Sequence, residues 1–360
     1  MQRYKLVLAA AGAMTAFVVS AQQAPTAGPY SVQKKAKVGG TGGTDYIYAD
    51  ADGRRLYIPR TGNPSRITVF DLDTLAPVGE VPNASAHGAA VSTKSGHGFA
   101  TSKPVVMWDT KTLATIKTID VQGNPDGILY DAFNDRVYIL SHQAPNATVI
   151  AAADGSVLGT IDLGGMPEQG VTDGKGHLYF DIEDKANIAA VDAKTMMVTA
   201  HYDLAGKGGT CAGLAIDAKN NILFAACRNP AAMVILNAGD GKILDALPIG
   251  GGTDGATFNP NTMEAFSAHT DGVMYVIKEN SPTSFAVEQT VPTMQGARTL
   301  TLDAKTNRVL LMAFELAAPA TPPAAPPADA PAAAPGGRGG RGGGRGQQVP
   351  DSFTIIAVGK

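Results

Sequence analysis

The stretch GNPDGILYDAFNDRVYILS, residues 123–141, decides the fold of this chain. Apolar residues in a strand pattern flank the polar turn DAFND, which is typical of two antiparallel strands joined by a tight turn. Six related stretches occur elsewhere in the chain, and a polar residue begins each turn. Those turn residues are 39 to 44 positions apart: Asp50, Ser92, Asp131, Asp173, Asp217, Asn259 and Asp303.

A repeat of about forty residues is the period of a four-stranded propeller blade. The second half of each repeat fits this period: residues 67–81 (ITVFDLDTLAPVGEV) form a β-branched strand, a polar turn and another strand. The last repeat has only SFTIIAVG, 352–359, and YSVQKKAKV, 30–38, is the strand without a partner. We therefore predict an all-β, seven-bladed propeller over residues 30–360. The N-terminal strand pairs into the last blade and closes the ring, which removes exposed edges.

The composition agrees with a turn-rich β protein, because 42 glycines and 23 prolines in 360 residues are too many for a helical one. Residues 1–21 combine a basic start, an apolar run too short to span a bilayer comfortably, and small residues up to Ala21. This pattern predicts a cleaved signal peptide, followed by a short linker at 22–29 and by a periplasmic or secreted protein. An N-terminal anchor helix is the alternative. No second apolar run predicts a transmembrane span.

The charge of the chain is acidic. The formal net charge is −3, and removal of Arg3 and Lys5 with the signal peptide makes it about −5. Such a balance gives no general attraction to nucleic acid or to anionic lipid.

One segment cannot form a core. Residues 317–350 are rich in Pro, Ala, Gly and Arg and contain almost no apolar side chain larger than alanine, so we predict a disordered loop inserted in the last blade. Arg338, Arg341 and Arg345 suggest an RGG-like contact with nucleic acid, but a solvated spacer is the favoured interpretation. A contact with an acidic partner or an envelope polymer is the third option.

The turn residues themselves are interpreted as structural, because Asp and Asn cap such turns. The position five residues earlier is more informative, since the innermost strand of each blade begins there and lines the central channel. We expect the polar side chains at this position to form a ring at one channel mouth: Asp45, His87, Asp126, Glu168, Asp254 and Arg298, with Ala212 in the remaining repeat. The second strand ends at the same face, which adds Arg60, Lys103, His142, Asp181, Glu183, Arg228 and His269.

These candidate ligand-binding residues suit a small cationic or hydroxyl-rich molecule. They also suit a divalent cation such as Ca²⁺, with Asp126 and Glu168 as the candidate metal ligands. A water-filled polar mouth is favoured over a metal site, because nonadjacent blades are too far apart for all ligands to reach one ion. No G-x-S-x-G, H-E-x-x-H, P-loop or C-x-x-C pattern is present, so no catalytic or cofactor-binding residue is assigned.

The two cysteines, Cys211 and Cys227, are placed symmetrically about Lys219 in the turn of one hairpin. Antiparallel pairing sets them opposite each other, with Cα atoms about 4.5 to 5.5 Å apart, within reach of a disulfide. An oxidising compartment would let the bond form. Two buried free thiols are the alternative.

The repeats resemble a known family. Residues 121–141 and 163–181 (LGGMPEQGVTDGKGHLYFD) are similar to the YVTN repeats of YncE-like seven-bladed propellers, and the similarity extends over 30–316 and 351–360. VMWDTKT, 106–112, resembles a WD40 repeat at the third strand. The resemblance implies an exported or periplasmic propeller, often of undefined activity.

Two function classes follow. The first is a monomeric binding or scaffolding protein of the cell envelope, with a small polar ligand or an envelope protein or polymer as its partner. The second, less favoured because no catalytic motif is visible, is a metal-assisted, lactonase-like hydrolase that uses the channel carboxylates.

Overall fold

The computed structural model describes residues 25–317 and 347–360. The predicted signal peptide, residues 1–21, lies outside the described residues, as does most of the predicted loop. The described part consists of strands, turns and one short 3₁₀ helix, η1 (Glu183–Lys185). None of its helices has the length and apolar character needed to cross a membrane.

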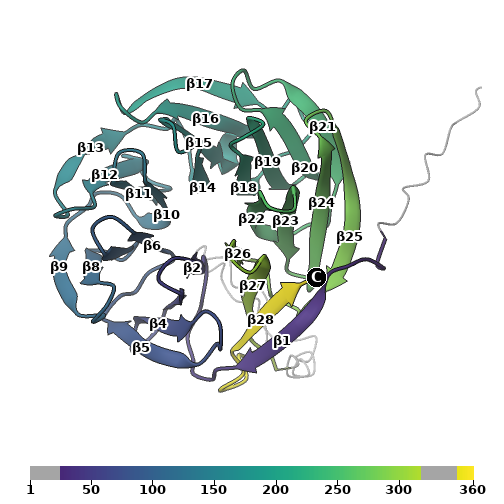
Figure 1. Cartoon of the computed structure of the whole chain (residues 1–360). Helices are drawn as coiled ribbons and strands as arrows, with labels where there is room; N and C mark the ends of the chain where they lie inside the picture. The colour runs from purple at the N-terminus through teal and green to yellow at the C-terminus, as the bar shows by residue number, and fades with distance from the viewer. Residues whose placement is uncertain (1–24, 318–346) are drawn as a thin grey trace, which may run out of the picture.

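The strands form seven four-stranded antiparallel sheets, arranged as blades around a central channel (Figure 1). Six blades use consecutive strands. Blades 1 to 3 contain β2 (Tyr48–Asp50), β3 (Arg55–Arg60), β4 (Arg66–Asp71), β5 (Pro77–Pro82), β6 (Ala89–Ser92), β7 (His97–Ala100), β8 (Val105–Asp109), β9 (Thr115–Ile119), β10 (Pro125–Asp131), β11 (Arg136–Ser141), β12 (Ala147–Ala151) and β13 (Val157–Ile161). Blades 4 to 6 contain β14 (Pro167–Thr172), β15 (His177–Ile182), β16 (Asn187–Asp192), β17 (Met197–Asp203), β18 (Cys211–Asp217), β19 (Ile222–Arg228), β20 (Ala231–Asn237), β21 (Ile243–Pro248), β22 (Thr253–Asn259), β23 (Glu264–His269), β24 (Val273–Ser281) and β25 (Ser284–Pro292).

The seventh blade joins the two ends of the chain. It contains β26 (Leu300–Asp303), β27 (Arg308–Ala313), β28 (Thr354–Gly359) and, as its outer strand, β1 (Ser31–Lys37). β1 runs antiparallel to β28, as the purple and yellow strands in Figure 1 show, and the predicted closure is confirmed. Just before β1, the hydroxyl of Tyr30 donates a hydrogen bond to Glu264 of blade 6, and its ring lies edge-on to Phe266. The closing strand is therefore attached to two blades.

The described ends of the predicted loop are paired. The amide of Ala317 donates to the carbonyl of Gln347 at 2.7 Å, and the amide of Val349 donates to the carbonyl of Glu315 at 2.9 Å. Residues 317 and 347–349, at the ends of the predicted loop 317–350, thus extend the hairpin of the last blade. The disorder of the intervening residues stays a prediction.

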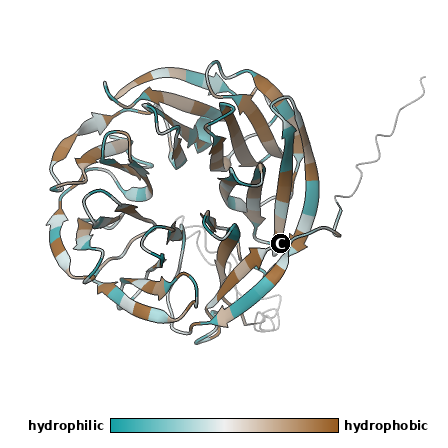
Figure 2. Ribbon diagram, viewed as in Figure 1, coloured by the Kyte–Doolittle hydropathy of each residue, from teal (hydrophilic) through white to brown (hydrophobic). Residues whose placement is uncertain are grey.

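The hydrophobic core lies between blades rather than in one central mass. Each cluster of buried side chains joins two neighbouring blades. The outer strands of the blades alternate hydrophobic and hydrophilic residues (Figure 2). Trp108 is fully buried between blades 1 and 2, with its ring 5.8 Å from that of Tyr57. Gly98 is its partner on the next strand, and a Cβ atom there would lie 2.1 Å from the indole. The tryptophan fits because its neighbour has no side chain.

The turn residues have the structural role expected of them. Asp131, Asp173, Asp217, Asn259 and Asp303 each accept a hydrogen bond from the backbone amide two residues later. Some of them also connect blades. Asp303 of blade 7, which is fully buried, accepts from both terminal nitrogens of Arg54 in blade 1, each at 2.8 Å.

The two cysteines form the predicted disulfide. Cys211 lies directly opposite Cys227 in the β18–β19 pair, and the bond is present. Their Cα atoms are 3.7 Å apart, closer than expected for opposed residues, at a point where the register shifts between Cys211 and Gly213.

We expect Gly98→Ala to destabilise the fold by about 1–3 kcal/mol, because the added methyl group overlaps the indole of Trp108. Gly251→Ala is the matched control, since a Cβ atom there meets nothing within 4 Å, and we expect a change of about 0.5 kcal/mol or less. Thermal or denaturant unfolding measures both. Equal stability of the two variants would show that Trp108 is not packed as described.

Arg54→Met should destabilise the protein at pH 7 by about 2–4 kcal/mol, because it removes the closer cation from the buried carboxylate of Asp303 and leaves only Arg308, 3.8 Å away. Burial raises the pKa of Asp303, but hydrogen bonds from Arg54 and Thr306 outweigh burial and leave that pKa lowered. The stabilisation from a lowered carboxyl pKa is present above about pH 4 and is lost as the pH falls through the folded-state value. The difference between wild type and variant should therefore shrink in acid.

The control for this prediction is Lys305→Met, which breaks an exposed ion pair with Asp52 and should change stability by less than about 1 kcal/mol. A pH-independent difference between wild type and Arg54→Met, followed by urea unfolding from pH 3 to pH 7, would contradict the assignment to Asp303.

Candidate functional site

The polar residues predicted at the strand starts do meet at one mouth of the channel. Asp126, Glu168 and Asp254 are the second residues of β10, β14 and β22, while Asp45, His87 and Arg298 lie in the segments that lead into the first strands of their blades. They surround a cavity of ≈ 270 Å³ that is lined by Asp45, His87, Asn124, Asp126, His142, Glu168 and Asp254. Constant spacing of five residues from the turn places them at the same height in their blades.

One half of the mouth, which we call the acidic arc, consists of Asp45, His87, Asp126, His142 and Glu168. The Nδ1 atom of His87 lies 2.9 Å from Oδ2 of Asp45 and 3.2 Å from Oδ1 of Asp126. The Nε2 atom of His142 lies 3.2 Å from Oδ2 of Asp126 and 3.5 Å from Oε1 of Glu168. The arc thus passes through blades 1, 2, 3 and 4 as alternating carboxylates and imidazoles.

The other half, the arginine arc, consists of Arg298, Asp254, Arg228 and Glu183. Arg298 lies 2.7 Å from Asp254, and Arg228 pairs both with Asp254 and, at 2.9 Å, with Glu183. Arg298 also lies 3.7 Å from Asp45, which joins the two arcs at one end. At the other end Glu183 and Glu168 interact closely enough to raise the pKa of Glu183, after the larger effect of burial. Blade 5 has Ala212 at the ring position, and Arg228 supplies its charge instead.

Carboxylates outnumber guanidinium groups in this ring. Burial raises the pKa of Asp126 to about 6, although the nearby imidazoles oppose the rise. The carboxylate of Glu168, 3.5 Å from Nε2 of His142, raises the pKa of His142 to about 9, and the hydrogen bond with Asp45 raises the pKa of His87. Both shifts favour the protonated imidazoles, whose positive charge would offset part of the negative charge of the ring, and the excess of carboxylates suits cationic or hydrogen-bond-donating groups.

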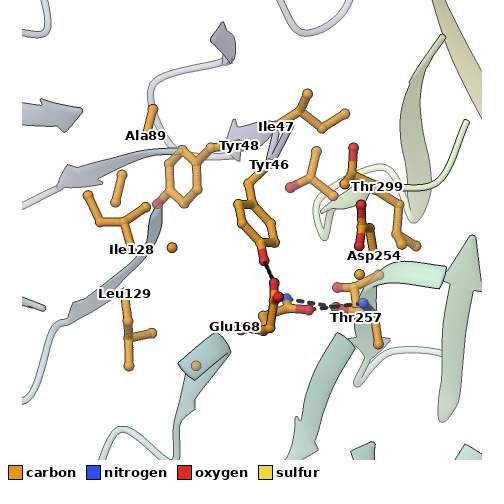
Figure 3. A pocket seen from close by; sticks show the side chains of 18 of the residues that line it. Tyr46, Ile47, Tyr48, Ala89, Ile128, Leu129, Glu168, Asp254, Thr257 and Thr299 are labelled. Atoms are coloured by element: carbon orange, nitrogen blue, oxygen red, sulfur yellow. Dashed lines mark hydrogen bonds between the residues drawn. The ribbon is translucent and has the colours of Figure 1, made fainter. Parts of the chain in front are cut away.

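Two side chains beside the ring connect blades across the channel. The hydroxyl of Tyr46 in blade 1 donates a hydrogen bond of 2.7 Å to Oε2 of Glu168 in blade 4, so it spans the channel (Figure 3). The side chain of Gln169 accepts from the amides of Leu214 and Ala256 and donates to the carbonyl of Ala256, each at 3.0 Å. A second cavity of ≈ 200 Å³ is lined by Tyr46, Tyr48, Leu129, Glu168, Gln169 and Thr299, among others.

Sequence reasoning missed Tyr46 and Gln169, although a signal was present. They follow the ring position directly, where four of the seven repeats carry glycine: Gly88, Gly127, Gly213 and Gly255. A Cβ atom at Gly127 would lie 2.4 Å from the carbonyl oxygen of Glu168, because the strands converge there. A large residue at a position that is otherwise glycine indicates a side chain directed into the channel.

Arg60 and His269, also predicted as ligand-binding residues, lie outside the ring that the other residues form. Arg60 is 1% exposed, and its guanidinium lies 3.4 Å above the ring of Phe353, where burial lowers its pKa to about 10. His269 is 0% exposed, contacts Ser267 and the carbonyl of Gly251, and has a pKa lowered by burial. Neither side chain is accessible to a ligand.

The acidic arc contains two groups of side-chain atoms that could bind a metal ion. Asp45, His87 and Asp126 form one, and Asp126, His142 and Glu168 form the other; within each group the donor atoms lie within 4.8 Å of one another. The candidate metal residues Asp126 and Glu168 thus face the same imidazole.

Comparison with solved structures identifies proteins with a similar fold. No family model matches the chain, and no curated protein matches its sequence. In shape it is similar to the WD40 repeats of RRP9, with a TM-score of 0.68 at 10% identity over 94% of this chain and 99% of that chain. This chain is a seven-bladed β-propeller with WD40-repeat structural neighbours.

Two other solved structures agree. A chain in the crystal structure of the mitotic checkpoint complex matches with a TM-score of 0.66 at 9% identity, over 86% of this propeller and 95% of that chain. A chain of hydrazine synthase from Kuenenia stuttgartiensis matches with a TM-score of 0.64 at 14% identity, over 75% and 92%. At these identities the likeness extends to the fold alone.

Tyr46→Phe should lower the free energy of unfolding by about 1–3 kcal/mol, because it removes a hydrogen bond to a poorly exposed carboxylate. Tyr179→Phe removes the hydroxyl of another tyrosine, one whose ring is buried between blades and whose hydroxyl has no hydrogen-bond partner among the described residues, and should change stability little. Urea unfolding at pH 7 compares them. Equal losses would show that Tyr46 does not anchor Glu168.

Proposed function

We propose that this propeller is an exported, YncE-like binding protein of the cell envelope that takes a small cationic or hydroxyl-rich ligand at the mouth of its channel. The observation that carries the proposal is the cavity of ≈ 270 Å³ lined by the acidic arc together with Asn124 and Asp254. A structural ion-pair network would not need an open cavity. This one surrounds space for a ligand.

The exposure of the ring supports binding. The side chain of His87 is 46% exposed, those of His142 and Arg298 are 32% and 30% exposed, and the carboxylates between them are 9–19% exposed. A ligand can therefore reach the polar atoms while the carboxylates stay fixed by their neighbours. The small volume suits a molecule of a few heavy atoms rather than a polymer chain.

Export is supported by the Cys211–Cys227 disulfide, since such bonds persist in oxidising compartments such as the periplasm. In its broader form, the proposal is that the monomer acts as a scaffold and binds an envelope protein or polymer. The sequence repeats described above support the YncE-like assignment.

A metal-assisted, lactonase-like hydrolase is the second candidate. It is favoured by one observation, the two groups of imidazole and carboxylate donors in the acidic arc, since a bound divalent ion can activate water for attack on an ester. Hydrolysis of sugar lactones that stops on addition of a chelator would support this candidate. Absence of hydrolysis over a broad lactone panel, with or without added metal, would contradict the hydrolase and leave the binding protein as the remaining candidate.

The binding proposal is tested with a panel of polyols, polyamines and amino acids by thermal shift and calorimetry on chelator-treated protein. We expect at least one class to bind, and Asp126→Asn with Glu168→Gln to weaken it by about tenfold or more, because both carboxylates border the cavity. Asp173→Asn, in the turn at the opposite end of β14, should bind as wild type does. Equal affinity of the double variant would exclude the mouth as the site.

A further inference from the structure

The geometry points to a pair of divalent transition-metal ions in the acidic arc, bridged by Asp126. The inference deepens the proposed function and rests on it for the use of the site, because it places the ions in the same channel mouth. The binding of metal is a separate property of the arc and depends on its donor atoms alone.

Asp126 is placed as a bridging carboxylate. Its Oδ1 atom faces Nδ1 of His87 and its Oδ2 atom faces Nε2 of His142, each at 3.2 Å. One carboxylate that presents a different oxygen to each of two imidazoles is the arrangement that holds two ions side by side. Metal ions in such pairs lie about 3.5–4 Å apart.

Each half of the arc completes a three-donor group. The first ion would take Asp45, His87 and Oδ1 of Asp126, and the second would take Oδ2 of Asp126, His142 and Glu168. With metal–ligand bonds of about 2.0–2.2 Å, neighbouring donors in octahedral or tetrahedral geometry lie about 2.9–3.6 Å apart. The nitrogen–oxygen distances here are 2.9, 3.2, 3.2 and 3.5 Å. These nitrogen–oxygen distances match the spacing of neighbouring metal ligands, and all donor atoms of each group lie within 4.8 Å of one another.

The two imidazoles give an independent indication that the arc binds metal ions. Each directs a single ring nitrogen at two carboxylate oxygens, although one N–H can align well with only one acceptor. For His142, that nitrogen is shielded from solvent and has no well-formed hydrogen bond within the described part of the chain. A metal ion in place of the proton would satisfy the nitrogen and both carboxylates together.

Neighbouring groups hold the donors in position. Tyr46 binds Oε2 of Glu168 and leaves Oε1 to face His142. Arg298 lies near Oδ1 of Asp45, and Oδ2 of the same carboxylate faces His87. Partners of this kind orient metal ligands and support affinity.

The donor types select the metal. Ca²⁺ takes six to eight oxygen ligands, whereas imidazole nitrogen suits zinc and other first-row transition ions. Three protein ligands per ion is the number found in catalytic Zn²⁺ sites, which leave a position open for water or a ligand. The two histidines therefore favour Zn²⁺ over the Ca²⁺ expected from the carboxylates alone.

Equilibrium dialysis of the tag-free, chelator-treated chain against ZnCl₂, with metal analysis of the protein, tests the inference. We expect two Zn²⁺ per chain and at least tenfold weaker binding of Ca²⁺. His87→Gln and His142→Gln should each retain one ion, and Asp126→Asn should weaken both by about tenfold or more. His177→Gln is the control, because its imidazole lies 2.8 Å from Asp173 in a pair outside the arc.

Fewer than two Zn²⁺ in wild type, unchanged binding in Asp126→Asn, or Ca²⁺ bound as tightly would each overturn the bridged pair. Should an arc variant fail to fold, Mn²⁺ titration of wild type decides: the expected electron paramagnetic resonance spectrum is that of two exchange-coupled ions, and the six-line spectrum of isolated Mn²⁺ at saturation would contradict it. Because metal salt is the only addition, absence of binding would overturn this inference and leave the ligand proposal standing. A failed ligand panel would leave the metal result standing.

Discussion

The convergence of seven innermost strands on one channel is the constraint on which the rest of the structure depends. At that convergence the backbones approach so closely that a Cβ atom at Gly213 would lie 2.6 Å from the carbonyl carbon of Gly255 in the next blade. Glycine is therefore required in several blades. The space that it leaves is filled by Tyr46 and Gln169, whose hydrogen bonds cross the channel. The same geometry that permits the ring to close thus brings the charged side chains to one mouth and lets two side chains connect blades beside them.

Ring closure and the site are mechanically connected. The seam between blades 1 and 7 is joined by the Arg54–Asp303 pair at the turns, and Asp45 and Arg298 face each other across the same seam at the mouth. Blade 7 exists as a four-stranded sheet only because β1 supplies its outer strand. A change far from the channel, in the N-terminal strand, would therefore disturb the join between the acidic and arginine arcs. This is the usual behaviour of a repeat fold that has been closed, in which each blade depends on both neighbours.

The sequence predicted the fold well because one period governs the chain, and a constant offset of five residues from the turn was enough to place Asp45 beside His87. The sequence did not predict features that depend on the direction of a side chain rather than on residue spacing. Arg60 and His269 end their strands at the correct face, but each turns into protein, the first onto Phe353 and the second beneath Gly251. The pairing of particular atoms was also beyond reach, since spacing alone cannot show that the two oxygens of Asp126 face different imidazoles.

The separation of the blades, which argued against a metal in the channel mouth, applies to a single central ion and not to ions along the rim. Each donor group of the acidic arc draws on neighbouring blades, 1 to 3 for the first and 3 to 4 for the second, with distances of 2.9 to 3.5 Å between nitrogen and oxygen. One ion at the centre of the ring would be too far from its ligands, whereas two ions could bind side by side along the curved rim. On the opposite rim Arg228 and Arg298 occupy the corresponding places and would repel cations. The mouth is therefore polarised, and a ligand that spans it would meet cations bound on one side and fixed guanidinium groups on the other.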